Sequence, residues 1–214
     1  MKIGVFDSGI GGEALANALQ QTFPEAQIQV VNDHDNVPYG DKTSAEITEL
    51  TDLAIQPLLT KGCDVIVIAC NTATAVAIEI LRQKYPSQHF IGIEPMVKTA
   101  AKQTKSDVIA VCATPATLAS ERYRGLVSKY ASHLTVIEPD CSGWAYMIEN
   151  NEINEQEIAK VINDVCERGA DVIVLGCTHY HWIKELVQKL TNGNAIVLEP
   201  SEAIGRQVSE LLGL

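Results

Sequence analysis

Two similar stretches, Gly62–Ala73 (GCDVIVIACNTA) and Gly169–Tyr180 (GADVIVLGCTHY), decide how the rest of the chain is organised. Each combines a glycine, an aspartate and a run of mostly branched apolar residues with a cysteine that is followed by polar side chains. The two cysteines, Cys70 and Cys177, lie 107 residues apart, which is half of the 214-residue chain. The repeat predicts two similar halves that each present one thiol.

The apolar run in each stretch predicts a strand that is buried on both faces of a parallel sheet. Short runs of branched apolar residues bounded by turn residues are typical of such strands, and these runs lack the period of an amphipathic helix. Each cysteine then lies at the carboxyl end of a central strand, where ligands bind in open α/β sheets. We therefore expect both thiols in one shared cleft.

Strand and helix patterns alternate along the rest of the chain. We expect strands at residues 2–6, 27–31, 64–69, 89–93, 107–111, 134–137, 171–175 and 195–198. We expect helices at residues 13–21, 43–59, 73–84, 117–130, 144–150, 154–168 and 201–212. Thr43 and Glu46 have the spacing of a capping box, and Ser201 should cap the last helix. Pro57 should kink the second helix or mark its last turn.

Alternating strands and helices predict an α/β fold with a mostly parallel sheet in each half. The order of elements repeats, and Ile93-Glu94-Pro95 in the first half corresponds to Leu198-Glu199-Pro200 in the second. This indicates an internal duplication. We expect two similar α/β domains related by a pseudo-two-fold axis, with the active site in the cleft between them.

Charge and composition exclude several classes of partner. The net charge is −11, and no run of basic residues suggests binding to nucleic acid or to an anionic membrane. An anionic substrate remains compatible, because helix N-termini supply local positive potential. We find no signal peptide and no apolar run of about 18 residues, so we expect a cytoplasmic protein. Its six cysteines are then expected to be free, catalytic or metal-binding rather than disulfide-bonded.

Two opposed thiols suit a specific reaction. A thiol titrates near about 8.5, and a helix N-terminus lowers this pKa, so we expect a lowered pKa at both Cys70 and Cys177. One thiolate could remove a proton from a carbon while the other thiol returns a proton to the opposite face, which inverts a stereocentre. Short polar side chains at the strand ends would bind a small dicarboxylate or amino acid; they are Ser8, Asn71, Thr72, Thr114, Thr117 and Thr178.

Six short motifs, spread over nearly the whole chain, resemble those of the glutamate racemases in the cofactor-independent aspartate/glutamate racemase superfamily. They are Phe6–Gly9 (FDSG), Pro38–Gly40 (PYG), Ala69–Ala73 (ACNTA), Glu94-Pro95, Ala113-Thr114 with Thr117, and Gly176–Tyr180 (GCTHY). The resemblance implies interconversion of L- and D-glutamate without pyridoxal phosphate or metal. It also implies a role in supplying D-glutamate for peptidoglycan.

The resemblance further implies roles for individual residues. Cys70 and Cys177 would be the acid/base thiols, assisted by Asp7, Glu149 and His179. Substrate would be bound by Ser8, Tyr39, Gly40, Asn71, Thr72, Thr114, Thr117 and Thr178. The first domain would comprise residues 1–95 and 203–214, and the second residues 96–202. The oligomeric state is not fixed, and a homodimer is among the states allowed.

The chain departs from the family pattern and leaves alternatives open. It is shorter than most members, and Asp33–Asp35, Cys141–Trp144 and His181 differ from the usual residues. One alternative is a racemase that acts on aspartate or a hydantoin, and another is a non-catalytic amino-acid-binding protein. A third is a zinc site made by Cys177, His179 and His181 with Cys70. Packing roles are expected for three other cysteines, Cys63, Cys112 and Cys166, while Cys141 is left open.

Overall fold

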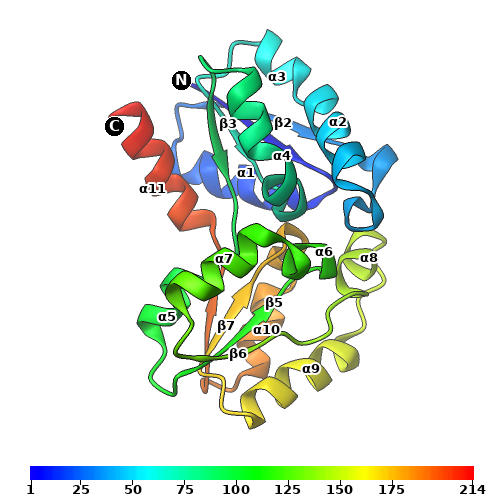
Figure 1. The fold of residues 1–214 in the computed structure, drawn as a ribbon, viewed down its shortest axis with the longest axis vertical. Coiled ribbons are helices and arrows are strands. Elements are labelled where there is room, and N and C mark those ends of the chain that lie inside the picture. The colour runs from blue at the N-terminus through cyan, green and yellow to red at the C-terminus, as the bar shows by residue number, and fades with distance from the viewer. The chain divides into compact units, whose positions relative to one another are not determined.

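The structure is a computed structural model that describes all 214 residues, and the chain divides into two compact units (Figure 1). One unit comprises Met1–Glu94 together with Pro200–Leu214, and the other comprises Pro95–Glu199. The chain therefore leaves the first unit once and returns to it for its last helix.

The first unit is built on a four-stranded parallel sheet in the order β2-β1-β3-β4. Its strands are β1 (Lys2–Asp7), β2 (Gln27–Asn32), β3 (Val65–Ile68) and β4 (His89–Gly92). Its helices are α1 (Gly11–Thr22), α2 (Ser44–Ala54), α3 (Gln56–Thr60), α4 (Asn71–Lys84) and α11 (Ser201–Leu212), with two short 3-10 turns, η1 (His34–Asn36) and η2 (Tyr39–Asp41).

Helices cover both faces of this sheet because its central strands are apolar on both sides. Ile3 and Val5 of β1 pack in one core with Leu15 of α1 and Val208 of α11. Phe6, on the opposite face of β1, packs in a second core against residues of α2, α3 and α4. In Figure 1 the C-terminal helix α11, in red, lies beside the blue α1, which agrees with the contacts between these helices.

The second unit contains another four-stranded parallel sheet, in the order β6-β5-β7-β8. Its strands are β5 (Val108–Cys112), β6 (Thr135–Ile137), β7 (Val172–Leu175) and β8 (Ile196–Leu198). Its helices are α5 (Val97–Gln103), α6 (Pro115–Ala119), α7 (Glu121–Tyr130), α8 (Trp144–Glu149), α9 (Glu155–Glu167) and α10 (Lys184–Leu190), and a 3-10 segment, η3 (Thr178–Ile183), precedes α10.

The two sheets share one strand order, which confirms the predicted α/β fold and the repeat. In each unit the first and third strands pair at the centre, with Val5 beside Val67 and Ala110 beside Ile173. All four residues of β3 and of β7 are buried, as expected for strands covered on both faces. Cys70 and Cys177 each follow the third strand of their sheet after one intervening residue.

Several helix predictions need correction. The helix expected over residues 43–59 is two helices that meet at Ile55, with Pro57 in the first turn of α3, where proline is tolerated. Its capping box is confirmed, because Thr43 and Glu46 exchange the expected hydrogen bonds. Ser201 does not cap α11, since Pro200 occupies the N-cap position. The helix expected over residues 117–130 is likewise divided, into α6 and α7, which meet at Ser120. The sequence analysis missed α5 and α10, because the seven residues of each give too short a pattern to be detected by period.

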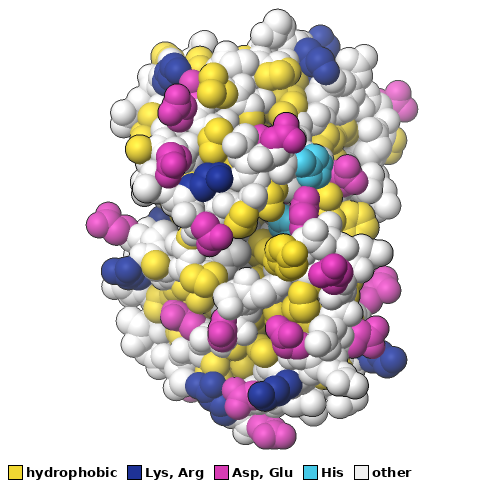
Figure 2. Space-filling model, turned by 90° about the vertical axis from the view of Figure 1, so that its right-hand side faces the viewer, with side chains coloured by type: hydrophobic (Ala, Val, Ile, Leu, Met, Phe, Trp, Pro, Cys, Tyr) yellow, Lys and Arg dark blue, Asp and Glu magenta, His cyan; other side chains and the backbone are white.

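The helices include no membrane span, and the face drawn in Figure 2 shows no basic stripe. No helix combines the length and the apolar character that crossing a membrane would require. On the face drawn in Figure 2, acidic side chains are scattered among apolar and uncharged ones, and basic side chains occur in small separate groups.

Candidate active site

Cys70 lies between β3 and α4, where its side chain caps the helix. Its backbone is extended, and its Sγ accepts a hydrogen bond from the backbone N–H of Ala73 at 3.4 Å. The hydroxyl of Ser8, which follows β1, donates to the same sulfur at 3.2 Å. Asn71 and Thr72 open α4 beside the thiol, and both are buried. The adjacent ends of β1 and β3 therefore bring these four predicted residues together.

The thiol of Cys70 is harder to ionise than the sequence predicted. Burial raises the pKa of this thiol to about 11, and the charge of nearby Asp7 acts in the same direction. Hydrogen bonds from Ser8, Ala73 and Thr72 lower the pKa but do not offset these effects. The predicted lowering is therefore wrong for Cys70, which is a neutral thiol near pH 7 in the substrate-free protein.

Asp7 is the last residue of β1 and is fully buried. Its Oδ1 accepts a hydrogen bond from the backbone N–H of Gly9 at 2.9 Å, which shapes the turn into α1. Gly12, in the first turn of that helix, lets α1 approach the strand, because an added Cβ would lie 2.7 Å from Cβ of Asp7. The glycine-rich turn thus positions the carboxylate beside the Cys70 site.

The loop after β2 presents Tyr39 to the core of the first unit. The ring of Tyr39 is buried against Phe6, with 6.3 Å between centroids, and its hydroxyl donates to Oδ2 of Asp33 at 2.6 Å. Asn36 donates to the other oxygen of the same carboxylate at 2.9 Å. Gly40 follows Tyr39 in η2 and is exposed. Sequence analysis missed Asp33 as the residue that fixes Tyr39, although it had noted that Asp33–Asp35 depart from the family pattern.

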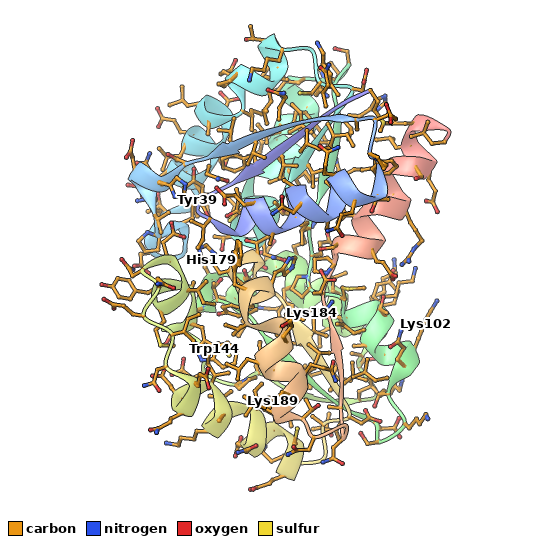
Figure 3. The ribbon with its side chains drawn as sticks, turned by 180° about the vertical axis from the view of Figure 1, so that it is seen from behind. Tyr39, Lys102, Trp144, His179, Lys184 and Lys189 are labelled. Carbon is orange, nitrogen blue, oxygen red and sulfur yellow. The ribbon has the colours of Figure 1, made fainter.

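Cys177 has different neighbours, supplied by η3 and α8. Nδ1 of His179 lies 3.8 Å from Sγ of Cys177, and Nε2 of the same ring lies 2.6 Å from Oε2 of Glu149. Figure 3 shows His179 on the segment that leads into α10, which begins at Lys184 and has Lys189 in its last turn. The three side chains form a series of carboxylate, imidazole and thiol.

This series allows proton transfer from the thiol. Because the carboxylate of Glu149 accepts a hydrogen bond, we assign the ring proton of His179 to Nε2. Nδ1 then presents a lone pair to Cys177, so the imidazole can accept the thiol proton. Cys177 precedes a 3-10 segment rather than an α-helix, and its side chain makes no capping hydrogen bond, unlike Cys70.

An aromatic contact holds the elements that carry this series. Trp144, the first residue of α8, packs edge-on against Tyr180 of η3, with 5.2 Å between ring centroids. The hydroxyl of Tyr180 and the backbone N–H of Trp144 both donate to the carbonyl oxygen of Cys141, at 3.0 and 3.1 Å. Sequence analysis missed this support, because it joins residues 36 positions apart.

The predicted threonines of the second unit also lie at strand ends. Thr114 caps α6 after β5, accepting from the backbone N–H of Thr117 at 3.3 Å, and the two hydroxyl oxygens are 3.0 Å apart. Thr178 follows Cys177 and is buried. The carboxyl edge of the second sheet therefore gathers these hydroxyl groups near the strand that leads to Cys177.

The side chains proposed as zinc ligands do not converge. His179 faces Glu149, whereas Nε2 of His181 lies 3.7 Å from Oε2 of Glu199. No group of three or more His, Cys, Asp or Glu side chains is arranged to hold a metal ion. The spacing of Cys177, His179 and His181 is therefore explained by two separate carboxylate contacts.

Removing the charge of Asp7 should make the Cys70 thiol easier to ionise. Asp7→Asn keeps an oxygen that can accept from Gly9 but removes the negative charge that disfavours the thiolate. We expect the pKa of Cys70 to fall from about 11 by roughly one unit. The pH dependence of iodoacetamide labelling, read by mass spectrometry of the Cys70 peptide, measures this shift. Labelling of Cys166 is the internal control, and an unchanged or higher midpoint for Cys70 would contradict the prediction.

Comparisons with known proteins agree with the motifs and the fold. A family model described as Asp/Glu/Hydantoin racemase matches residues 12–207. The chain is 38% identical to a glutamate racemase of Herpetosiphon aurantiacus over 98% of its own length and 84% of that protein.

Solved structures give the same result. A glutamate racemase from Francisella tularensis in complex with D-glutamate is 29% identical, with a TM-score of 0.82 over 99% of this chain and 80% of that one. The Escherichia coli glutamate racemase in complex with L-glutamate and the activator UDP-MurNAc-Ala has a TM-score of 0.91 at 24% identity, over 99% of this chain and 82% of that one, and shares the fold.

Proposed function

Because the chain belongs to the Asp/Glu/Hydantoin racemase family, we propose that it interconverts L- and D-glutamate by two-thiol proton transfer at the α-carbon. The observation that carries this proposal is the equivalent placement of two thiols. Each follows the third strand of a sheet with the same strand order, and each has its own proton-handling neighbours. The glutamate racemases among its relatives favour glutamate as the substrate.

In one direction of the proposed reaction, Cys177 removes the α-proton. Its thiol proton first passes to Nδ1 of His179, whose imidazolium is stabilised by Glu149, and the resulting thiolate takes the proton from carbon. Cys70, which rests as a thiol, gives its proton to the opposite face of the carbanion. The products are the inverted amino acid and a Cys70 thiolate, which is stabilised by the Ser8 hydroxyl and the Ala73 N–H. The reverse direction exchanges the two roles.

The other predicted residues would hold the substrate. The buried Oδ1 of Asn71 has no hydrogen-bond partner in the protein, so it can accept from the substrate ammonium group. Hydroxyl donors aimed at the α-carboxylate would stabilise the carbanion, and Asp7 would tune the charge around Cys70. The proposed substrate-binding set is Ser8, Tyr39, Gly40, Asn71, Thr72, Thr114, Thr117 and Thr178. In this proposal the chain acts as two domains, and each domain contributes one thiol. The first domain comprises residues 1–95 and 203–214, and the second comprises residues 96–202.

Incubation of the dialysed protein with amino acids in deuterated water tests the proposal. We expect deuterium at the α-carbon and loss of optical rotation with L- or D-glutamate, without added pyridoxal phosphate, metal or nucleotide. Faster exchange with aspartate would move the assignment to an aspartate racemase. Binding of glutamate without exchange would instead indicate a non-catalytic binding protein.

The proposed cellular role follows from the product. D-Glutamate is a component of peptidoglycan, so we propose that the protein supplies this amino acid to cell-wall synthesis in the cytoplasm. Because one chain contains both thiols, the proposed chemistry is compatible with a homodimer but does not require one.

A further inference from the structure

The first sheet has an open edge at β2. No strand lies beyond β2 in the order β2-β1-β3-β4, and its six residues pair only with β1. The backbone N–H groups of Gln27 and Asp33 donate to carbonyl oxygens at either end of β1. Because the residues of a parallel strand bond alternately to its two sides, the N–H and C=O groups of Ile28, Val30 and Asn32 point away from β1. No backbone hydrogen bond satisfies these groups on the open side.

The other three edge strands leave less backbone open. Strands β6 and β8 contain three residues each, and only the middle ones, Val136 and Val197, point their backbone groups outward. On β4 the outward carbonyl oxygen of Phe90 accepts a hydrogen bond from the guanidinium group of Arg82 at 3.0 Å. Short strands and charged side chains are common means of keeping a sheet edge from pairing with another chain. Strand β2 has neither protection, because it is six residues long and contains no charged residue and no proline.

The surroundings of β2 leave this edge accessible. Val30, near the middle of the strand, is 40% exposed. Figure 3 shows β2 on the near side of the first unit, with no helix drawn in front of it. Lys61 reaches the strand, but its Nζ donates to Oε1 of Gln29 at 2.6 Å, so it holds a side chain and leaves the outward backbone groups open. An uncharged edge of this kind is a template for another strand.

We propose that two copies of this chain pair through β2 in antiparallel orientation, with the two-fold axis at Val30, so that two first-unit sheets become one continuous sheet. Directly opposite residues in an antiparallel hydrogen-bonded pair exchange both of their N–H···O bonds. An axis at Val30 places this residue opposite its own copy and places Ile28 opposite Asn32 of the second copy. Every outward N–H and C=O group of β2 then has a partner. The edge is therefore complementary to itself, which is the requirement for a two-fold interface.

The side chains fit the same arrangement. Val30 lies in register beside Val5, and Ile28 packs in the core that contains Ile3 and Val5, so both point to the sheet face covered by α1. The two-fold axis brings the exposed Val30 side chains of the two copies together. Pairs of branched apolar residues across neighbouring strands stabilise antiparallel sheets. Because two strands of six residues make a small interface, we expect a dissociation constant in the micromolar rather than the nanomolar range.

Concentration-dependent measurements on the unmodified protein test this pairing. Sedimentation velocity should show monomers in dilute solution and dimers at high protein concentration. Residue-resolved amide hydrogen exchange should show that the amides of Ile28, Val30 and Asn32 become protected as the concentration rises. The amides of Gln29 and Val31, which face β1, should be protected at both concentrations. This alternation distinguishes strand pairing at β2 from a dimer formed through another surface.

Two substitutions at the proposed axis should weaken the dimer without disturbing the first sheet. Val30→Lys brings two like charges together, and we expect the dissociation constant to rise by at least about tenfold. Val30→Pro removes the outward N–H and keeps the bonds to β1, because proline is tolerated on the open side of an edge strand. Ile196→Lys is the matched control, since Ile196 is 47% exposed on edge strand β8. It should leave the dissociation constant unchanged, and far-UV circular dichroism checks the fold of each variant.

Three outcomes would overturn the inference. One is a monomer at every concentration, and a second is a dimer that neither Val30→Lys nor Val30→Pro weakens. The third is a dimer in which the amides of Ile28, Val30 and Asn32 stay unprotected, since the copies then meet through another surface. None of these measurements involves turnover, so the interface stands or falls independently of the proposed racemisation.

Discussion

Replacing either proposed acid/base thiol by alanine should lower the rate of racemisation by at least about a thousandfold, which is within the range that general acid–base groups contribute. Cys70→Ala leaves no proton donor at the first sheet, and Cys177→Ala leaves no acceptor for the proton at the second. Each variant should still fold, because each substitution removes only one sulfur atom at a strand end. The measurement is the initial rate of change of optical rotation with L- and D-glutamate.

Proton exchange distinguishes a lost thiol from a damaged fold. With one thiol left, the α-proton can be removed and returned on the same face, so deuterium should enter one enantiomer without inversion. Cys70→Ala and Cys177→Ala should therefore exchange opposite enantiomers. Cys166→Ala, which removes a half-buried thiol on α9, is the matched control and should keep normal turnover. Near-normal racemisation by either active-site variant would refute the two-thiol mechanism.

The strands and their order were predictable because the information is local and repeated. The runs before Cys70 and Cys177 are apolar on every residue, which is characteristic of strands covered on both faces. Glycines and short polar residues mark where these strands end. Helix boundaries were less predictable where two short helices share one pattern, as at Ile55 between α2 and α3. Such breaks depend on packing rather than on local preference.

The surroundings of the two thiols could be predicted only in part. The sequence predicted that Cys70 directly precedes a helix. It could not show that burial raises the pKa of the thiol by more than the helix N-terminus lowers it. His179 and Glu149 were predicted through family resemblance, because 30 residues separate them and no periodic pattern links them. Contacts such as Tyr39 with Asp33 depend on the path of a loop, which composition does not determine.

Trp144→Ala should cause the largest loss of stability among single substitutions near the site. The side chain is 1% exposed and packs against Tyr180, so its removal leaves a cavity between α8 and η3. Truncation of a buried tryptophan costs about 3–5 kcal/mol. We expect a loss of this size in the free energy of unfolding of the second unit, measured by urea unfolding with far-UV circular dichroism. Turnover should fall as well, because the same contact positions Glu149 and His179.

Trp144→Phe separates the effect of ring packing from that of the indole N–H. Nε1 of Trp144 is buried without a hydrogen-bond partner in the protein, and such a group costs about 1–3 kcal/mol. Phenylalanine keeps an aromatic ring against Tyr180 and removes this N–H, so it should destabilise far less than alanine does. Trp182→Ala, at a side chain that is 48% exposed, should change stability by less than about 0.5 kcal/mol. If Trp144→Ala were as stable as Trp182→Ala, the aromatic contact would not be what holds α8 against η3.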